Sequence, residues 1–361
     1  MSFNGLYVYF YKMKHWESKD YQKVNESFRC RLVYHVGKEY GFFVELNYML
    51  NAMIYCLSRR IQFQIYSADA NFGTGIGWTE YFQPFCKEVH EAYHAKYNFH
   101  RPPSWKQVLK EVLKQHSLKM GGWKTKMIVK TMVGRIIGLW TYHEKVLLSQ
   151  DIQLRTDRHF SIPELGIEGD YYHVFGILAR MIWQPQSSLQ QQMANARLRL
   201  SLPKAYSGVQ IRRGDKVAES RLISGWQIIR ALHPKDGDCI FVLTDSYLEF
   251  EKVKNEFPQL RFVTLCQPNE TGYYHQEFIH LQPQEKKESI IRLLASVDIL
   301  LHCSAFVGTI TSGPSVFLMK VRVDDPYVTA IDCPQDMLLS CLSLNIDDRA
   351  IISQKYMKQD I

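Results

Sequence analysis

Apolar residues in the first 200 positions recur mainly at helical spacing. In residues 41–66 a glycine turn leads into an amphipathic helical pattern. The run from Ile61 then alternates apolar and polar positions, which predicts a helix followed by a strand. Residues 86–160 also carry helical periodicity and are predicted to be mostly helical. Residues 170–200 predict two helices that are broken near Pro185.

Beyond residue 205 the pattern changes, because short apolar runs now alternate with helical periodicity. The predicted strands lie at 208–212, 239–244, 260–265 and 297–303, and the predicted helices lie near 224–232, 247–256 and 287–296. Strand-helix repetition at a spacing of roughly 25–35 residues is typical of a parallel, doubly wound sheet. The predicted fold class is therefore α/β, with a helix-rich α/β domain over 1–200, a Rossmann-like nucleotide-binding domain over 201–345 and a carboxyl-terminal tail over 346–361.

The most unusual residues follow the first strand of this second part. The sequence SGVQIRRGDKVAES (207–220) places Arg212, Arg213, Asp215 and Lys216 directly after an apolar alternation. Ligands of open α/β sheets bind at strand ends, and the arginine fork matches a phosphate group bidentately. The alternative interpretation is a surface turn whose arginines are solvated or paired with acids.

Two further loops follow predicted strands and are expected at the same edge of the sheet. Thr244 and Asp245 come after the apolar run 239–243, and the segment 304–315 is dense in small hydroxyl residues and glycines. A helix that begins near Gly313 would present its amino terminus to an anion. The candidate nucleotide-binding residues on these two loops are Thr244, Asp245, Thr309, Thr311 and Ser312.

Charge and composition narrow the function classes. The net charge of +8 favours anionic partners, but the basic residues are scattered, whereas a nucleic-acid protein more often has a dense basic stripe. No G-x-x-x-x-G-K-[ST] sequence occurs, so a P-loop kinase or ATPase is unsupported. The apolar segment 127–140 is interrupted by two charges and is too short to span a membrane. The amino terminus lacks the features of a secretory signal.

Cysteine and acidic residues give no sign of a metal centre. None of the eight cysteines forms a C-x-x-C pair, and three lie in apolar runs, which predicts buried free thiols and a reducing, cytoplasmic compartment. Asp236 and Asp238 imitate a metal-binding Asp-x-Asp motif, but they precede their strand and are interpreted as a turn. The sequence therefore predicts no metal.

The chain resembles the α-1,6-fucosyltransferase family, which includes core-fucosylating and rhizobial nodulation enzymes. The most specific block is residues 180–217, where SGVQIRRGDKV is similar to the family's G-V-H-V-R-R-x-D-K-V. Weaker agreement covers 38–78, 241–246 and 294–306. Gln210 stands where the family has histidine, Ser246 replaces its second aspartate, and the aspartate expected near 290 is absent.

This resemblance implies a GT-B-like fold, with GDP-fucose as donor substrate, no metal or other cofactor, and inversion at the sugar carbon. It also implies that Arg212 and Arg213 hold the diphosphate, that Asp215 orients them and that Lys216 supports the site. Gln210 would lie in an altered donor site. Independently of the resemblance, Glu219 is a candidate base for the acceptor hydroxyl, because it follows the same strand end. The alternative interpretation of Glu219 is a solvated loop residue.

The sequence thus predicts a metal-independent inverting glycosyltransferase that transfers fucose to a glycan or lipid-linked sugar, with Arg212 and Glu219 as catalytic residues. The predicted location is cytoplasmic, with lysines able to touch an anionic membrane surface. One alternative is an inactive glycan- or nucleotide-binding protein of the same fold, and another is a transferase for a different nucleotide sugar. RNA binding through the arginines is a weaker alternative and is not predicted.

Overall fold

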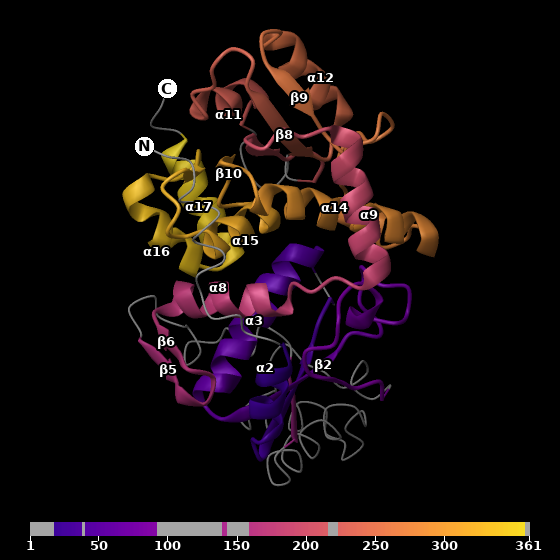
Figure 1. The fold of residues 1–361 in the computed structure, drawn as a ribbon, viewed down its shortest axis with the longest axis vertical. Coiled ribbons are helices and arrows are strands. Elements are labelled where there is room, and N and C mark those ends of the chain that lie inside the picture. Colours follow the sequence, from indigo (N-terminus) through magenta and orange to yellow (C-terminus); the bar gives the residue numbers. More distant parts are fainter. Residues whose placement is uncertain (1–17, 38–39, 92–138, 143–158, 216–222, 358–361) are drawn as a thin grey trace, which may run out of the picture.

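Two parallel sheets, one in each half of the chain, form the framework of the protein (Figure 1). The computed structural model describes residues 18–37, 40–91, 139–142, 159–215 and 223–357. Both halves combine parallel strands with helices, as the predicted α/β class requires.

The amino-terminal sheet has the strand order β3-β2-β1-β4, and every pairing in it is parallel. Its strands are β1 (Cys30–His35), β2 (Ile61–Tyr66), β3 (Lys87–Glu88) and β4 (Leu139–Tyr142). Helix α3 (Phe42–Ser58) connects β1 to β2 and is buried along most of its length, as the apolar spacing predicts. The other elements of this half are α2 (Ser18–Glu26), η1 (Trp78–Glu80), β5 (Phe160–Ile162), η3 (Pro163–Leu165), β6 (Ile167–Gly169), α8 (Tyr171–Ile182) and α9 (Ser187–Leu200).

The carboxyl-terminal sheet has the order β11-β10-β7-β8-β9, again with parallel pairings throughout. Its strands are β7 (Ser207–Ile211), β8 (Cys239–Thr244), β9 (Arg261–Val263), β10 (Ala305–Gly308) and β11 (Val328–Ala330). The helices that follow them are α11 (Gly225–Ala231), α12 (Tyr247–Glu256), α13 (His275–Phe278), α14 (Pro283–Leu301), α15 (Gly313–Val321), α16 (Leu338–Ser343) and α17 (Ile346–Tyr356), with η4 (Gln335–Met337) before α16.

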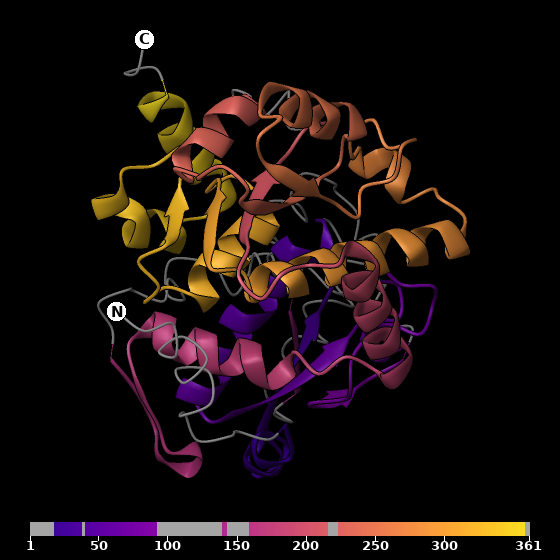
Figure 2. The ribbon, with the colours of Figure 1, turned by 45° about the horizontal axis from the view of Figure 1, so that its top comes forward.

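Helices cover both faces of this second sheet. Val209 and Ile211 of β7 pack with apolar residues of α11 and α12 on one face. The opposite face packs against α14 and α15 in a core cluster that continues into the amino-terminal half. In Figures 1 and 2, α14 and α15 accordingly lie between the carboxyl-terminal sheet and the half that contains α3 and α8. The second sheet is therefore doubly wound, as predicted.

Polar contacts also join the two halves. The amide nitrogen of Asn47 on α3 donates to the carbonyl of Gly313 at the start of α15, at 3.3 Å. Lys287 of α14 lies 3.4 Å from Glu80. Helix α17 occupies most of the predicted tail, and its Arg349 and Ser353 are buried. The end of the chain is thus packed onto the fold as far as Tyr356.

Two predictions of secondary structure are wrong. The apolar run 297–303, expected as a strand, is mostly the last turns of α14, and the strand is Ala305–Gly308. A short apolar run fits a buried helix as well as a buried strand, so its periodicity does not separate them. Residues 86–160 were expected to be mostly helical, but their described parts include the strands β3 and β4. Strand β4 pairs with β1 and carries strand-favouring aromatic and β-branched residues. The rest of 92–158 lies outside the described residues.

The described cysteines and helices agree with what the sequence predicts for them. All eight cysteines are free thiols, and Cys56, Cys239 and Cys303 are buried as predicted. Within the described ranges, none of the helices combines the length and apolar character that crossing a membrane requires.

Candidate functional site

The strand order of the carboxyl-terminal sheet defines a topological switch point. From β7 the chain proceeds to β8 and β9 on one side, and it later returns to form β10 and β11 on the other side. The carboxyl ends of β7 and β10 therefore diverge into connections on opposite faces of the sheet, which leaves a crevice between them. This crevice is where open α/β sheets bind ligands.

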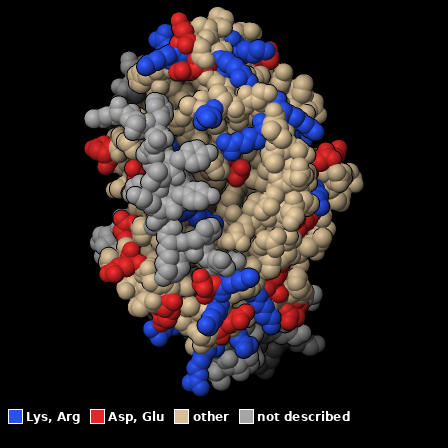
Figure 3. Space-filling view, viewed as in Figure 1, with Lys and Arg blue, Asp and Glu red and all other residues tan. Residues whose placement is uncertain are grey.

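The three predicted loops meet at this edge. The turn 212–215 follows β7, residues 245–246 follow β8, and the segment 309–312 follows β10, with all three strands parallel and adjacent. The space-filling view shows a hollow between the two halves with basic and acidic atoms at its rim (Figure 3). The prediction that these loops share one edge is confirmed.

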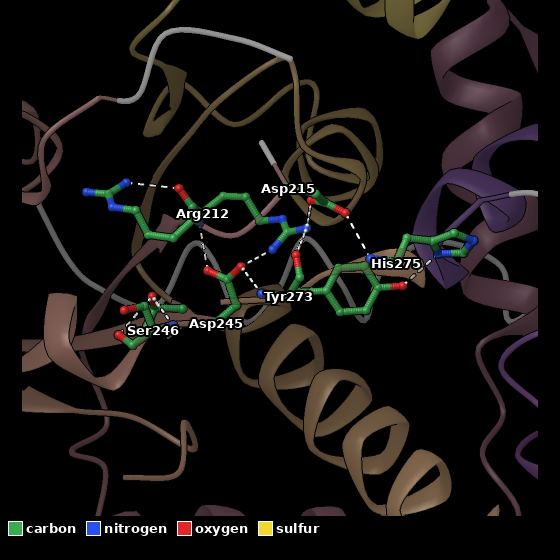
Figure 4. A network of polar contacts seen from close by, with 8 residues as sticks. Arg212, Asp215, Asp245, Ser246, Tyr273 and His275 are labelled. Carbon is green, nitrogen blue, oxygen red and sulfur yellow. Dashed lines mark hydrogen bonds and ion pairs between the residues drawn. The ribbon is translucent and has the colours of Figure 1, made fainter. Parts of the chain in front are cut away.

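Asp245 holds the ends of β7 and β8 together. Its carboxylate accepts hydrogen bonds from the backbone N–H of Arg213 at 2.7 Å and of Tyr273 at 2.8 Å. The same carboxylate forms an ion pair with the guanidinium of Arg212 (Figure 4). Because one side chain satisfies donors from two loops, removing it would disturb both loops at once.

Both arginines of the strand end have acidic partners. Besides Asp245, Arg212 donates to Asp215 at 2.6 Å and to the Tyr273 carbonyl at 3.3 Å, and its guanidinium lies 4.8 Å from the centre of the Tyr273 ring. The pairing with acids that the alternative interpretation proposes is thus present. Asp215 contacts Arg212, while its orienting role stays a prediction. Arg213 donates to Glu249 at 2.5 Å and to the carbonyl of Arg212 at 2.9 Å. These contacts use two of its five N–H donors.

A close backbone contact brings a fourth loop to the site. Gly214 has a φ of +64°, and a Cβ atom there would lie 2.5 Å from the nitrogen of Tyr273. Gly272 has a φ of +142°, and its Cβ atom would lie 2.8 Å from the Cα of Gly214. Two glycines therefore allow the segment 272–275 to pack directly against the arginine turn.

This segment adds two residues, Tyr273 and His275, that the sequence reasoning missed. Tyr273 stacks under Arg212, and its hydroxyl lies 3.0 Å from Nδ1 of His275 (Figure 4). The backbone of His275 donates to Asp215 at 3.1 Å. The segment lies about 60 positions from Arg212 in sequence and has no periodicity, so only the adjacent Gly272 and the aromatic pair could have drawn attention to it.

Helix α15 begins at the β10 side of the crevice, as predicted. Its N-cap Ser312 makes no side-chain cap, and helix amino termini favour anions. Ser312 is buried, and a Cβ atom at Gly313 would lie 2.9 Å from Cγ2 of Val44 on α3. Gln210 lies below this terminus, where its amide oxygen accepts a hydrogen bond from Ser315. Both side chains are buried, so this contact fixes α15 to β7. A direct role of Gln210 in donor binding stays a prediction.

Asp332 positions the loop before α15. Its carboxylate accepts from the Ile310 N–H at 2.8 Å and from Ser353 of α17 at 2.9 Å. Burial raises the pKa of Asp332 to about 6, despite these hydrogen bonds, which lower it. The loop that carries Thr309 and Thr311 is therefore held by a carboxyl group that titrates near neutrality.

We expect ionisation of Asp332 to lower the free energy of unfolding as pH rises from about 4 to 6. Its folded-state pKa lies above the unfolded value near 3.9, so the folded state binds the proton more tightly and the ionised group opposes folding above pH 6. Asp332→Asn should flatten this dependence and raise the free energy of unfolding at pH 8 by about 1–3 kcal/mol. Melting curves from pH 4 to 8 test this, and an unchanged slope in the variant would contradict it.

Some of the remaining predicted site residues have contacts in the structure, and others lie outside the described residues. Thr244 is buried and accepts from the Ser246 N–H at 3.2 Å, while Thr311 donates to Thr309 at 3.3 Å. Lys216 and Glu219 lie outside the described residues. Their assigned roles, like those of the other site residues, stay predictions.

The Asp-Gly-Asp sequence is a turn, as predicted. The Asp238 N–H donates to the Lys235 carbonyl at 3.0 Å, and Gly237 has a φ of +84°. The turn precedes β8 and therefore lies at the opposite edge of the sheet from the site. In the part of the chain that the structure covers, no group of three or more His, Cys, Asp or Glu residues is placed to hold a metal ion.

No protein-family model and no curated relative matches the chain. Among solved structures, it is similar to fucosyltransferase NodZ from Bradyrhizobium, at 12% identity and a TM-score of 0.47 over 82% of this chain and 93% of that one. It is also similar to a mutant of Arabidopsis thaliana FUT1 in complex with GDP, at 11% identity and a TM-score of 0.47 over 84% of this chain and 73% of that one. A third is POFUT1 in complex with GDP-fucose, at 11% identity and a TM-score of 0.40 over 81% of this chain and 95% of that one. A fucosyltransferase, NodZ, is thus among the solved structures to which the chain is similar.

Proposed function

We propose that this protein is a metal-independent, inverting fucosyltransferase that uses GDP-fucose and a glycan or lipid-linked sugar acceptor. The observation that carries the proposal is the convergence of Arg212, Arg213 and the amino terminus of α15 on the switch point of a doubly wound sheet. These groups are suited to a nucleoside diphosphate, because guanidinium groups and helix amino termini both favour phosphate oxygens.

The chemistry requires positive charge at the leaving group. As the bond between the sugar C1 and the phosphate oxygen breaks, negative charge develops on the diphosphate and must be stabilised. Fixed guanidinium groups can supply this stabilisation without a divalent ion. Arg212 is held in place by Asp215 and Asp245, so little reorganisation is needed when the donor binds. The acceptor would approach from the amino-terminal half, which faces the same edge through Gly41 and Asn47.

The proposed setting is cytoplasmic synthesis of a surface glycan, with the nucleotide sugar as the soluble partner. Contact with an anionic membrane through surface lysines is part of this proposal. It would bring a lipid-linked acceptor to the site.

A donor screen tests the proposal. We expect GDP and GDP-fucose to raise the melting temperature, since a ligand at 100 times its Kd stabilises the folded state by about 2.7 kcal/mol. UDP- and dTDP-sugars at equal concentration serve as matched controls. Release of GDP from GDP-fucose should require the acceptor and should be unchanged by EDTA.

Each other outcome has a defined meaning. Stabilisation by UDP- or dTDP-sugars instead would indicate a transferase with another donor. Stabilisation by GDP without turnover on any glycan acceptor would indicate a binding protein. If chelation abolished turnover and Mn²⁺ restored it, the metal-independent mechanism would be wrong.

A further inference from the structure

His275 is fixed to the turn that carries the arginines. Its backbone N–H donates to Asp215 Oδ2 at 3.1 Å, and the Asp215 N–H donates to the Tyr273 carbonyl at 3.0 Å. Beside this pairing Gly214 and Gly272 pack backbone to backbone, since a Cβ atom at Gly272 would lie 2.8 Å from the Cα of Gly214. The imidazole is therefore carried at a set position relative to Arg212.

The imidazole lies at the seam between the two halves of the molecule. Its Nδ1 is 3.0 Å from the Tyr273 hydroxyl, and a methyl group added at Gly41 would lie 3.7 Å from that same hydroxyl. Gly41 is the N-cap of α3 in the amino-terminal half. In Figure 4 His275 forms the outer end of the network, with its second ring nitrogen directed away from Tyr273.

We propose that His275 is the general base of the transfer reaction, a role that rests on the proposed function of this site. Nε2 of His275 takes the proton of the acceptor hydroxyl while that oxygen forms a bond to C1 of the sugar. The bond between C1 and the phosphate oxygen breaks, and its electron pair leaves with the diphosphate. The proton then passes from the imidazolium to solvent. The products are the fucosylated acceptor, GDP and one proton.

The surroundings of His275 fit this role. The proposal requires the tautomer that carries its proton on Nδ1, and the Tyr273 hydroxyl oxygen at 3.0 Å is placed to accept that proton's hydrogen bond, which leaves the lone pair on Nε2. Partial burial lowers the pKa of His275, while the nearby Asp215 acts in the opposite direction. Burial also raises the pKa of Tyr273, so its hydroxyl stays protonated and neutral. Glu277 is the other titratable residue on α13.

A histidine with a lowered pKa is mostly neutral at physiological pH, so it can accept a proton there. Because the neutral imidazole accepts the proton, the transfer rate should fall as pH drops through the pKa of His275 and should level off above it. A histidine that only supported the fold would impose no such acidic limb on kcat.

The test compares His275→Gln with His280→Gln, a matched change at an exposed histidine just after α13. We expect His275→Gln to lower kcat about 10²–10⁴-fold and to abolish the acidic limb, with GDP binding within about twofold of wild type. His280→Gln should match wild type in both respects. Tyr273→Phe should keep the acidic limb but shift its midpoint, because Tyr273 acts through His275. Added imidazole should partly rescue His275→Ala.

The outcomes separate the two proposals. If wild-type protein transfers fucose and His275→Gln keeps its rate and its acidic limb, His275 is not the base. Loss of the limb in Glu219→Gln but not in His275→Gln would assign the base to Glu219 and overturn this inference. If wild-type protein neither binds GDP nor transfers fucose, the proposed function fails before the base is tested.

Discussion

Arg212→Ala is expected to reduce fucosyl transfer about 10²–10³-fold, and it is expected to lower thermal stability in the same variant. The catalytic loss follows because the guanidinium offsets the charge that develops on the leaving diphosphate. The stability loss follows from the structure, since Arg212 is the ionic partner of both Asp215 and Asp245. Removing it leaves two partly buried carboxylates without their counter-charge, at a cost of about 1–3 kcal/mol.

Two further variants separate the catalytic from the structural role. Arg212→Lys should recover part of the lost stability, but not the rate, because an ammonium group cannot reproduce the bidentate fork. Arg199→Ala removes an exposed arginine of α9 and should leave both properties unchanged. Melting curves and steady-state rates on the same preparations are the measurement. Near wild-type turnover in Arg212→Ala would overturn the assignment of the site.

Gly214→Ala is expected to displace the segment 272–275 and to destabilise the protein by about 2–4 kcal/mol. At this position the φ of +64° already disfavours a side chain, and a Cβ atom would also meet the backbone of Tyr273. Backbone atoms cannot move aside as the end of a flexible side chain can. The displacement would break the hydrogen bonds from Tyr273 to Asp245 and from His275 to Asp215.

Gly237 provides the matched control for this prediction. Its φ is +84°, yet a Cβ atom there meets nothing within 4 Å. Gly237→Ala therefore carries the conformational cost alone, about 1–2 kcal/mol, and should leave GDP binding intact. Urea unfolding together with GDP titration of both variants measures the difference. Equal destabilisation with equal GDP affinity would show that the contact with Tyr273 does not hold the site together.

Much of the fold could be predicted from local pattern. The alternation around Val209 and the apolar run of β8 have strand periodicity, and the helices after them show an amphipathic spacing. Pro314 marks the start of α15, because proline suits the first turn of a helix. The prediction failed at residues 297–303. A buried helix that is apolar on nearly every side has the same run of apolar residues as a buried strand, so the pattern does not separate the two.

The candidate site could be predicted only in part. Strand ends of parallel strands share one edge, so Arg212, Asp245 and the loop before α15 could be placed together from sequence. A contact between Asp215 and Arg212 was also expected, but the pairing of Arg213 with Glu249 was not, because side-chain pairing depends on distances between loops. Sequence reasoning also gave no reason to place Tyr273 or His275 near Arg212.

The sequence by itself determined the residue types at the ends of β7, β8 and β10, and these are the basis for proposing an anionic ligand at this edge. Strand periodicity and loop chemistry are local properties, so they can be read without coordinates. Only the tertiary structure decided that β7 and β10 flank the switch point and that Gly214 and Gly272 bring His275 to the arginine turn. Those are contacts between distant segments, and they depend on the strand order and on backbone packing, which no local pattern specifies.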